Sequence, residues 1–134
     1  MPTKIILDCD PGHDDAVALL LAWGNPDIEL VGVTTVAGNQ TIDKVTRNAL
    51  AIAQVAGITG VPFARGAHRP LVREVEVAEG IHGESGLDGP VLPEPTIELD
   101  PRHAVDFIID TVMAAEPGEI TLVPNHEFTL VAAW

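Results

Sequence analysis

An apolar strand that turns at once into a helix is the feature that most constrains how this chain can fold. Residues 4–7 form a short apolar run, and Pro11 and Gly12 turn the chain a few residues later. Four apolar residues then follow the i, i+3, i+4, i+7 spacing of a helix: Ala16, Leu19, Leu20 and Trp23. Gly24 and Pro26 mark its end, and because apolar residues occupy its other faces too, we expect it to be covered on most sides. A strand leading into a covered helix is typical of a layered α/β domain.

Strand and helix patterns alternate along the rest of the chain as well. A run rich in β-branched residues over 29–36 precedes a helical pattern over 41–56, which Gly57 is placed to end. The segment "VPFARG" and residues 120–123 predict two further strands. The alternation predicts a single domain over residues 1–134 with an α/β fold: a Rossmann-like open, mainly parallel sheet with helices on both faces.

Residues 67–99 form a long irregular segment rich in Gly, Pro and Glu. Segments of this length without regular structure are typical of lids, binding loops or disorder. After it, Asp100 is a good N-cap and Pro101 a good first helical residue, so we predict a helix that begins there. Its apolar positions recur at helical spacing: Val105, Ile108, Ile109, Val112 and Met113.

Charge and composition exclude several classes of partner. The sequence has 20 Asp and Glu against 7 Lys and Arg, a formal charge of -13, whereas binding to a phosphate backbone needs a basic face. We therefore expect no nucleic-acid partner. One Cys forms no internal disulfide, and the sequence shows neither a leader pattern nor a long apolar stretch. We expect a cytoplasmic protein with no membrane partner, and we leave its oligomeric state open, a homo-oligomer included.

Four carboxylates gather where the first strand meets the first helix: Asp8, Asp10, Asp14 and Asp15. Because strand side chains alternate, Asp8 and Asp10 share one face, whereas the other two fall in the first helical turn. A helix N-terminus stabilises a carboxylate by only about 0.3–1 kcal/mol, too little to settle four. Crowded carboxylates either share a proton or recruit a cation such as Ca²⁺ or Mg²⁺. In the alternative, Asp14 and Asp15 merely cap the helix, and the two strand aspartates are solvated.

Three motifs follow one another along the chain: "DCDPGHDDAVAL", "GVTTVAGNQTIDKVTRNAL" and "IHGESGLDG". With these motifs in this order, the sequence resembles the N-terminal part of the inosine-uridine preferring nucleoside hydrolases. The resemblance implies hydrolysis of the N-glycosidic bond of a ribonucleoside to ribose and free base, with a bound Ca²⁺ in the site. Acid groups suit such chemistry because glycoside cleavage passes through an oxocarbenium-like state that carries positive charge.

The resemblance also implies a role for individual residues. Asp10 would bind the metal and act as general base on a metal-bound water, and Asp15 would be a second metal ligand. Asp14 and Asn39 would hold ribose hydroxyl groups, and His82 would lie on a loop that approaches the base.

Some positions depart from the family pattern. Asp8 belongs to the matching signature and is predicted to support the loop behind the metal ligands. After the fourth strand, Asn125 and His126 replace a Thr-Gly turn whose Thr offers a carbonyl to the metal. The resemblance further implies that a further Asp ligand and a His that assists the departing base lie outside this sequence, so we expect the chain to be the N-terminal portion of a hydrolase domain.

Two other functions stay open on the sequence alone. One is an inactive remnant that binds a metal ion or ribose without turnover. The other is a phosphohydrolase of the haloacid-dehalogenase type, because a strand ending in Asp-x-Asp could supply Asp8 as nucleophile and Asp10 as acid-base.

Overall fold

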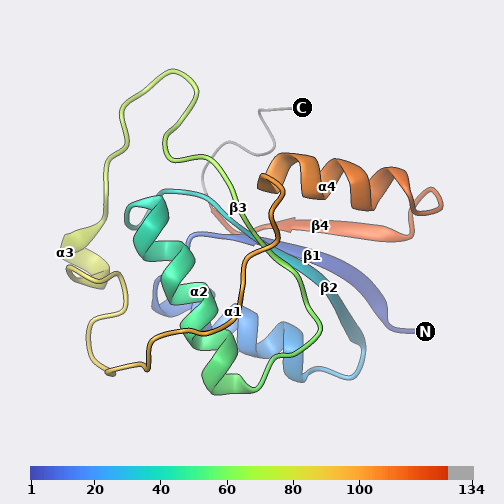
Figure 1. The fold of residues 1–134 in the computed structure, drawn as a ribbon, viewed down its shortest axis with the longest axis horizontal. Helices are drawn as coiled ribbons and strands as arrows, with labels where there is room; N and C mark the ends of the chain where they lie inside the picture. Colours follow the sequence, from blue (N-terminus) through green and yellow to red (C-terminus); the bar gives the residue numbers. More distant parts are fainter. Residues whose placement is uncertain (127–134) are drawn as a thin grey trace.

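Four parallel strands form the centre of the molecule. The structure is a computed structural model, and it describes residues 1–126. The strands are β1 (Thr3–Cys9), β2 (Ile28–Thr35), β3 (Phe63–Arg65) and β4 (Ile120–Pro124), and they pair in the order β3-β2-β1-β4 (Figure 1). The helices are α1 (His13–Gly24), α2 (Ile42–Ala56), α3 (Glu79–His82) and α4 (Ala104–Met113). All three strand pairs are parallel, as the alternation of strand and helix predicts.

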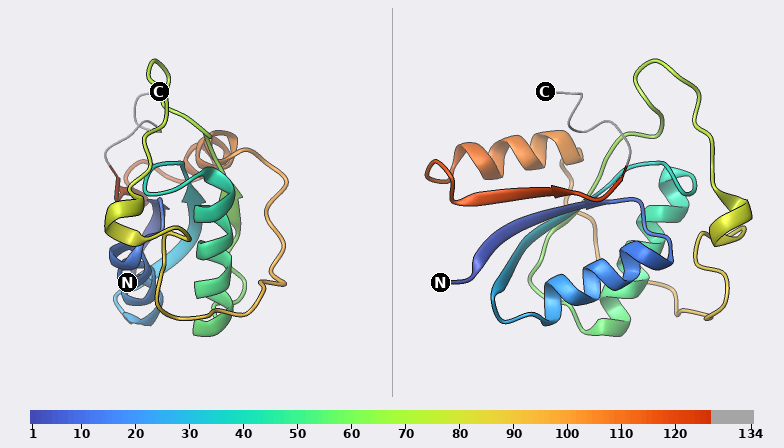
Figure 2. Two further views of the ribbon diagram at one scale, coloured as in Figure 1. Left: turned by 90° about the vertical axis from the view of Figure 1, so that its left-hand side faces the viewer. Right: turned by 180° about the vertical axis from the view of Figure 1, so that it is seen from behind.

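Helices cover both faces of this sheet. Helices α1 and α2 lie on one face and α4 on the other (Figure 2). Along β1, the side chains of Ile5, Leu7 and Cys9 join the core under α1 and α2, whereas Ile6 packs with Phe107 of α4. The predicted fold class is confirmed.

The first helix is less covered than its sequence predicts. Val17 and Leu21 of α1 are 65% and 62% exposed, and Leu20 and Trp23 are exposed as well. Only one side of the helix, which includes Leu19, packs against the sheet and α2 within the described part of the chain. The prediction that most faces are covered is therefore wrong, because a helix at the border of a four-stranded sheet meets neighbours on one side.

Helix α4 begins three residues later than predicted. Its N-cap is His103, whose ring accepts a hydrogen bond from the Val105 backbone N–H at 3.2 Å. Asp100 instead accepts bonds from the backbone and the guanidinium of Arg102 at 2.9–3.0 Å. The prediction of an Asp100 cap is wrong because this carboxylate is engaged in a turn before the helix.

The long segment between β3 and α4 runs past the carboxyl ends of the strands. Near its start the Ala67 carbonyl accepts a bond from Ala37 N–H, and further on Ala78 N–H donates to the Asn39 carbonyl. Helix α3 is the short helical turn within it. Residues 1–126 contain no helix with the length and apolarity needed to cross a membrane.

Candidate functional site

The carboxyl ends of β1, β2 and β4 meet at one edge of the sheet. Asp10 follows β1, Asn39 follows the end of β2 by four residues, and Asn125 follows β4. The chain passes from β1 to β2 in one direction and from β3 to β4 in the other, so β1 is the point where the strand order reverses. Ligands of open parallel sheets bind at this kind of switch point.

Asp10 and Asp15 form a buried pair at this edge. Asp15 lies in the first turn of α1 and accepts a hydrogen bond from the Asp10 backbone N–H at 2.8 Å. The Asp10 carboxylate accepts a bond from Asn39 N–H at 2.8 Å, and the Asn39 amide donates to the Asp10 carbonyl at 2.9 Å. Asp10 is 8% exposed and Asp15 is fully buried. The two carboxyl groups are close enough for each to shift the pKa of the other.

Burial controls the protonation of this pair. Loss of solvent raises the pKa of Asp15 to about 7, and the neighbouring Asp10 carboxyl adds to the rise. Burial also raises the pKa of Asp10, while the hydrogen bond from the Asn39 backbone opposes it. Two adjacent buried carboxyl groups therefore hold a proton between them or need a cation.

Asp8 is fully buried on the opposite side of β1 from Cys9. One carboxylate oxygen accepts a bond from the Thr34 hydroxyl at 2.6 Å, and the other contacts Nε2 of His126. This carboxylate thus ties β1 to β2 and to the residues after β4. A nucleophilic role for Asp8, as the phosphohydrolase alternative requires, does not fit a side chain with no access to solvent.

The alternative hypothesis, in which Asp14 and Asp15 only cap α1 and the strand aspartates are solvated, is also wrong. The N-cap of α1 is Gly12, and no side chain caps the helix. Asp8 and Asp10 are buried and not solvated, and Asp15 turns back to the end of β1. Only Asp14, whose side chain is 70% exposed, has the environment of an ordinary acidic residue in a first helical turn.

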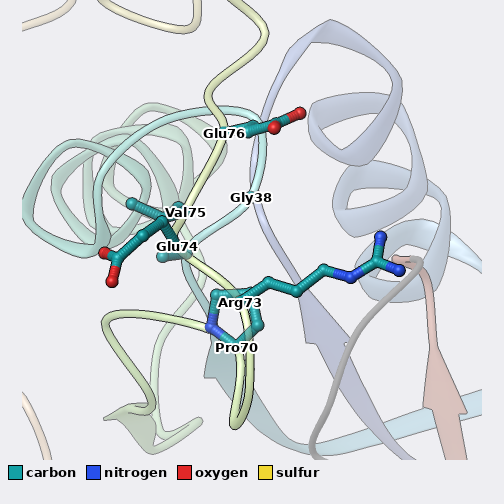
Figure 3. A pocket seen from close by; sticks show the side chains of 7 residues that line it. Gly38, Pro70, Arg73, Glu74, Val75 and Glu76 are labelled. Carbon is teal, nitrogen blue, oxygen red and sulfur yellow. The ribbon is translucent and has the colours of Figure 1, made fainter.

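A cleft of about 270 Å³ opens beside the buried pair. It brings Asp10, Asp14 and Asn39 together, as predicted, and adds three polar side chains: Glu76, Asn125 and His126. Glu76 belongs to an acidic run that gives no sequence signal for a site. It reaches the cleft because residues 67–78 fold against the loop that follows β2. A second cleft of about 340 Å³ shares Gly38 and Glu76, and Figure 3 shows Arg73 extended along it, away from Glu74.

His82 lies at the end of α3, beside the first turn of α1. Its Nε2 is 3.9 Å from a carboxylate oxygen of Asp14, and its ring lies against the backbone of Gly12. A Cβ at position 12 would be only 2.7 Å from Nδ1 of His82, so glycine is needed for this approach. His82 does not line the 270 Å³ cleft.

The residues after His82 form a turn around Asp88. Its carboxylate accepts bonds from the Ser85 hydroxyl at 2.6 Å and from the Ser85 and Glu84 backbone N–H groups at 3.0 and 3.1 Å. These bonds lower the pKa of Asp88. The side-chain amide of Asn48 in α2 anchors this turn by donating a hydrogen bond to the Ser85 carbonyl at 2.8 Å. The motif "HGESGLDG" therefore positions His82 through its own hydrogen bonds.

The donor chemistry of the Asp10–Asp15 pair fits a hard divalent cation in part. Two adjacent carboxylates in a buried setting provide oxygen ligands, and Ca²⁺ takes six to eight of these. Among residues 1–126, no group of three or more Asp, Glu, His or Cys side chains is close enough to hold a metal ion. Asp10 and Asp15 are therefore the two candidate side-chain ligands among the described residues. The Asn125 amide donates a hydrogen bond to the Asp15 carboxylate in the same place.

Comparison with known proteins decides which family this site belongs to. The model of the inosine-uridine preferring nucleoside hydrolase family matches residues 5–134. The chain belongs to this family. Over 133 residues it is 60% identical to the inosine-uridine preferring nucleoside hydrolase of Crithidia fasciculata and 51% identical to a pyrimidine-specific ribonucleoside hydrolase of Photobacterium profundum. These matches cover 98% of this nucleoside hydrolase chain but only 42% of either relative.

Solved structures of nucleoside hydrolases share the fold of this chain. The purine-preferring ribonucleoside hydrolase from Gardnerella vaginalis superposes with a TM-score of 0.90 at 35% sequence identity, covering 97% of this chain and 42% of that structure. The sequence resemblance and the predicted nucleoside hydrolase fold are therefore confirmed.

Proposed function

We propose that the strand-end aspartates form the calcium-and-ribose part of a nucleoside hydrolase site that cleaves the N-glycosidic bond of ribonucleosides. The observation that carries the proposal is the buried Asp10–Asp15 pair, held by Asn39 at the switch point of the sheet in a member of this family. Because the chain spans 42% of the length of the relatives it matches, the activity of the whole protein is part of the proposal.

In this proposal Asp10 and Asp15 hold a Ca²⁺ ion through their carboxylates. When bound, the ion would supply a lowered pKa to a coordinated water and an anchor for sugar diols. Asp10 accepts the proton that the attacking water releases, and its raised pKa suits a general base. The Asn39 N–H bond to Asp10 keeps the carboxylate oriented toward the cleft.

The other residues of the cleft bind the sugar. Asp14 and Asn39 line the cleft and offer an acceptor and an amide to ribose hydroxyls. The acidic surroundings, Glu76 included, stabilise positive charge that develops on the ribose ring. His82 lies beside Asp14, and from there we propose that it approaches the base. The buried Asp8 carboxylate supports the loop by accepting a hydrogen bond from Thr34 of β2.

The test is release of free ribose from inosine and uridine by the purified 134-residue chain with and without CaCl₂. We expect ribose release that depends on Ca²⁺, and a fall of about 10²- to 10⁴-fold in the Asp10→Ala variant, because a general base contributes that much to the rate. Full activity in that variant would sink the assignment. The exposed Asp27, changed to Asn, serves as the control for loss of one negative charge.

A binding role without turnover is the second candidate, favoured by the two-carboxylate ligand set among the described residues. In that case the chain would bind Ca²⁺ and release no ribose from either nucleoside. Because relatives of this chain carry names that specify inosine and uridine, pyrimidine or purine preference, the proposal extends to ribonucleosides as a class.

A further inference from the structure

His13, the first residue of α1, makes contacts that have no role in the proposed chemistry. Its Nε2 lies 2.9 Å from the Asp88 carbonyl oxygen, and its Nδ1 lies 3.2 Å from Nδ1 of His82. The two imidazole rings are 5.5 Å apart between centroids and tilted by 32°. His13 thus bridges the turn around Asp88 to the ring of His82.

The carbonyl partner determines which nitrogen of His13 carries the proton. A carbonyl oxygen only accepts hydrogen bonds, so Nε2 of His13 is the protonated nitrogen. In a neutral imidazole, the other nitrogen then has a lone pair and is an acceptor. Nδ1 of His13 can therefore bond to His82 only if Nδ1 of His82 is the donor.

A competing contact requires the opposite arrangement. The backbone N–H of His13 lies 3.4 Å from the same Nδ1 of His82 and would need a lone pair there. That distance is at the long end for a hydrogen bond, whereas the ring-to-ring distance is 3.2 Å and the bond to Asp88 is 2.9 Å. The shorter pair of contacts favours a proton on Nδ1 of His82.

We infer that His13 is a positioning residue that holds His82 in the tautomer protonated on Nδ1. The hydrogen bonds run from Nδ1 of His82 to Nδ1 of His13, and from Nε2 of His13 to the Asp88 carbonyl. Nε2 of His82 is then an acceptor, 3.9 Å from the Asp14 carboxylate. Nε2 of His82 and the Asp14 carboxylate could therefore both accept hydrogen bonds from a hydroxyl or N–H group of a ligand placed between them. A role for that contact in catalysis rests on the proposed function.

The surrounding backbone holds His82 in this arrangement. The absence of a side chain at Gly12 admits the ring, and Asp88 N–H donates to the His82 carbonyl at 3.1 Å. The turn around Asp88 is therefore bonded to the main chain of His82 directly and to its ring through His13, with no bound ligand needed.

Two-bond ¹H–¹⁵N correlation spectra of the full 134-residue chain, labelled with ¹⁵N-histidine, test this inference directly. The spectra are recorded at pH ~8.5, about two units above the ordinary histidine pKa, because the two tautomers of a neutral imidazole give distinct nitrogen signals. The signals of His82 are those missing from a His82→Gln spectrum. We expect the wild-type chain to show protonated Nδ1 and unprotonated Nε2 at His82.

Two substitutions of His13 separate its contacts. In His13→Leu the acceptor is gone, and the His82 pattern should change to protonation on Nε2, which the backbone N–H then favours. In His13→Asn the amide oxygen stands near the place of Nδ1 and should preserve the wild-type pattern. His68→Leu removes an exposed histidine of the long segment and should leave the His82 signals unchanged.

Protonation on Nε2 in the wild-type chain overturns the inference, and so does an unchanged His82 pattern in His13→Leu. If the leucine variant fails to fold, the wild-type and asparagine spectra still decide. None of these spectra requires turnover, so a chain that releases no ribose would contradict the proposed function without touching this result.

Discussion

The Asp10 carboxylate needs a glycine beside it, in the loop that follows β2. Gly38 lies against the Asp10 carboxylate, and a Cβ at this position would overlap the carboxylate oxygen and stand 3.1 Å from its carbon. The same oxygen accepts the Asn39 backbone N–H bond. The absence of a side chain at Gly38 thus allows the Asp10 carboxylate to accept a hydrogen bond from the backbone of Asn39.

The Gly38→Ala substitution should displace the Asp10 carboxylate. We expect the free energy of unfolding, measured in urea, to fall by about 1–3 kcal/mol, as in other overpacked sites. Ca²⁺ affinity should fall as well, because one of the two proposed ligands moves. Gly24→Ala at the end of α1 is the matched control, since a Cβ there meets nothing within 4 Å. Equal Ca²⁺ affinity in both variants would contradict the role given to Gly38.

Among the elements, α4 fixes one face of the sheet through a contact with a glycine. Gly32 of β2 lies under the ring of Phe107, and a Cβ there would be 2.5 Å from Cε1 of that ring. Glycine is otherwise poor in a strand interior, so close packing of the helix is the reason for it here. The contact holds α4 against the face of the sheet opposite α1 and α2.

Gly32→Ala should push α4 away from the sheet. The expected loss is about 1–3 kcal/mol of unfolding free energy, measured by urea denaturation followed by circular dichroism. The double variant Gly32→Ala/Phe107→Leu relieves the overlap and should recover part of that loss. A single variant as stable as the wild type would show that the helix has no such contact.

The turn before α4 should respond to acid. The bonds from Arg102 lower the pKa of Asp100 to about 2, from about 3.9 in an unfolded chain. A depressed folded pKa contributes stability above about pH 4 that is lost as the pH falls toward 2. The difference in urea midpoint between wild type and Asp100→Asn should therefore shrink over that interval. A difference that stays constant from pH 6 to pH 2 would refute this.

The sequence predicts those elements whose signals are local. The run before Asp8 and the Gly57 C-cap gave β1 and the end of α2, and Gly57 indeed has a φ of 71°. The exposure of α1 was missed because it depends on which neighbours the sheet provides. The path of residues 67–99 was missed because it rests on contacts distant in sequence, such as Asn48 with Ser85.

In the candidate site, too, some features have local sequence signals and others depend on contacts distant in sequence. Strand alternation and the turn at Pro11 and Gly12 predict only that the four aspartates gather where β1 meets α1. The pairing of Asp10 with Asp15 was implied by the family resemblance. Glu76 reaches the cleft only through the fold of the long segment, so no local pattern could reveal it. The tautomer of His82 likewise depends on a carbonyl far along the chain from His13.

At the scale of the whole molecule, the proposed metal site lies beside an open apolar surface. A groove of about 460 Å³ runs along β1, β4 and α1, and Asn125 lines both this groove and the cleft at Asp10. The relatives that this chain matches are more than twice as long, since it covers 42% of each. With two carboxylate ligands in the described residues, we expect Ca²⁺ to bind with a dissociation constant on the order of 10⁻⁴ M or weaker, as in sites with few charged ligands.

Calorimetric titration of the chain with CaCl₂ tests most directly whether the strand-end aspartates are a metal site. We predict one ion bound per chain, binding heat that disappears in Asp10→Asn and in Asp15→Asn, and unchanged binding in Asp27→Asn. Absence of binding to the wild-type chain, or undiminished binding in the Asp10→Asn/Asp15→Asn double variant, would contradict the account.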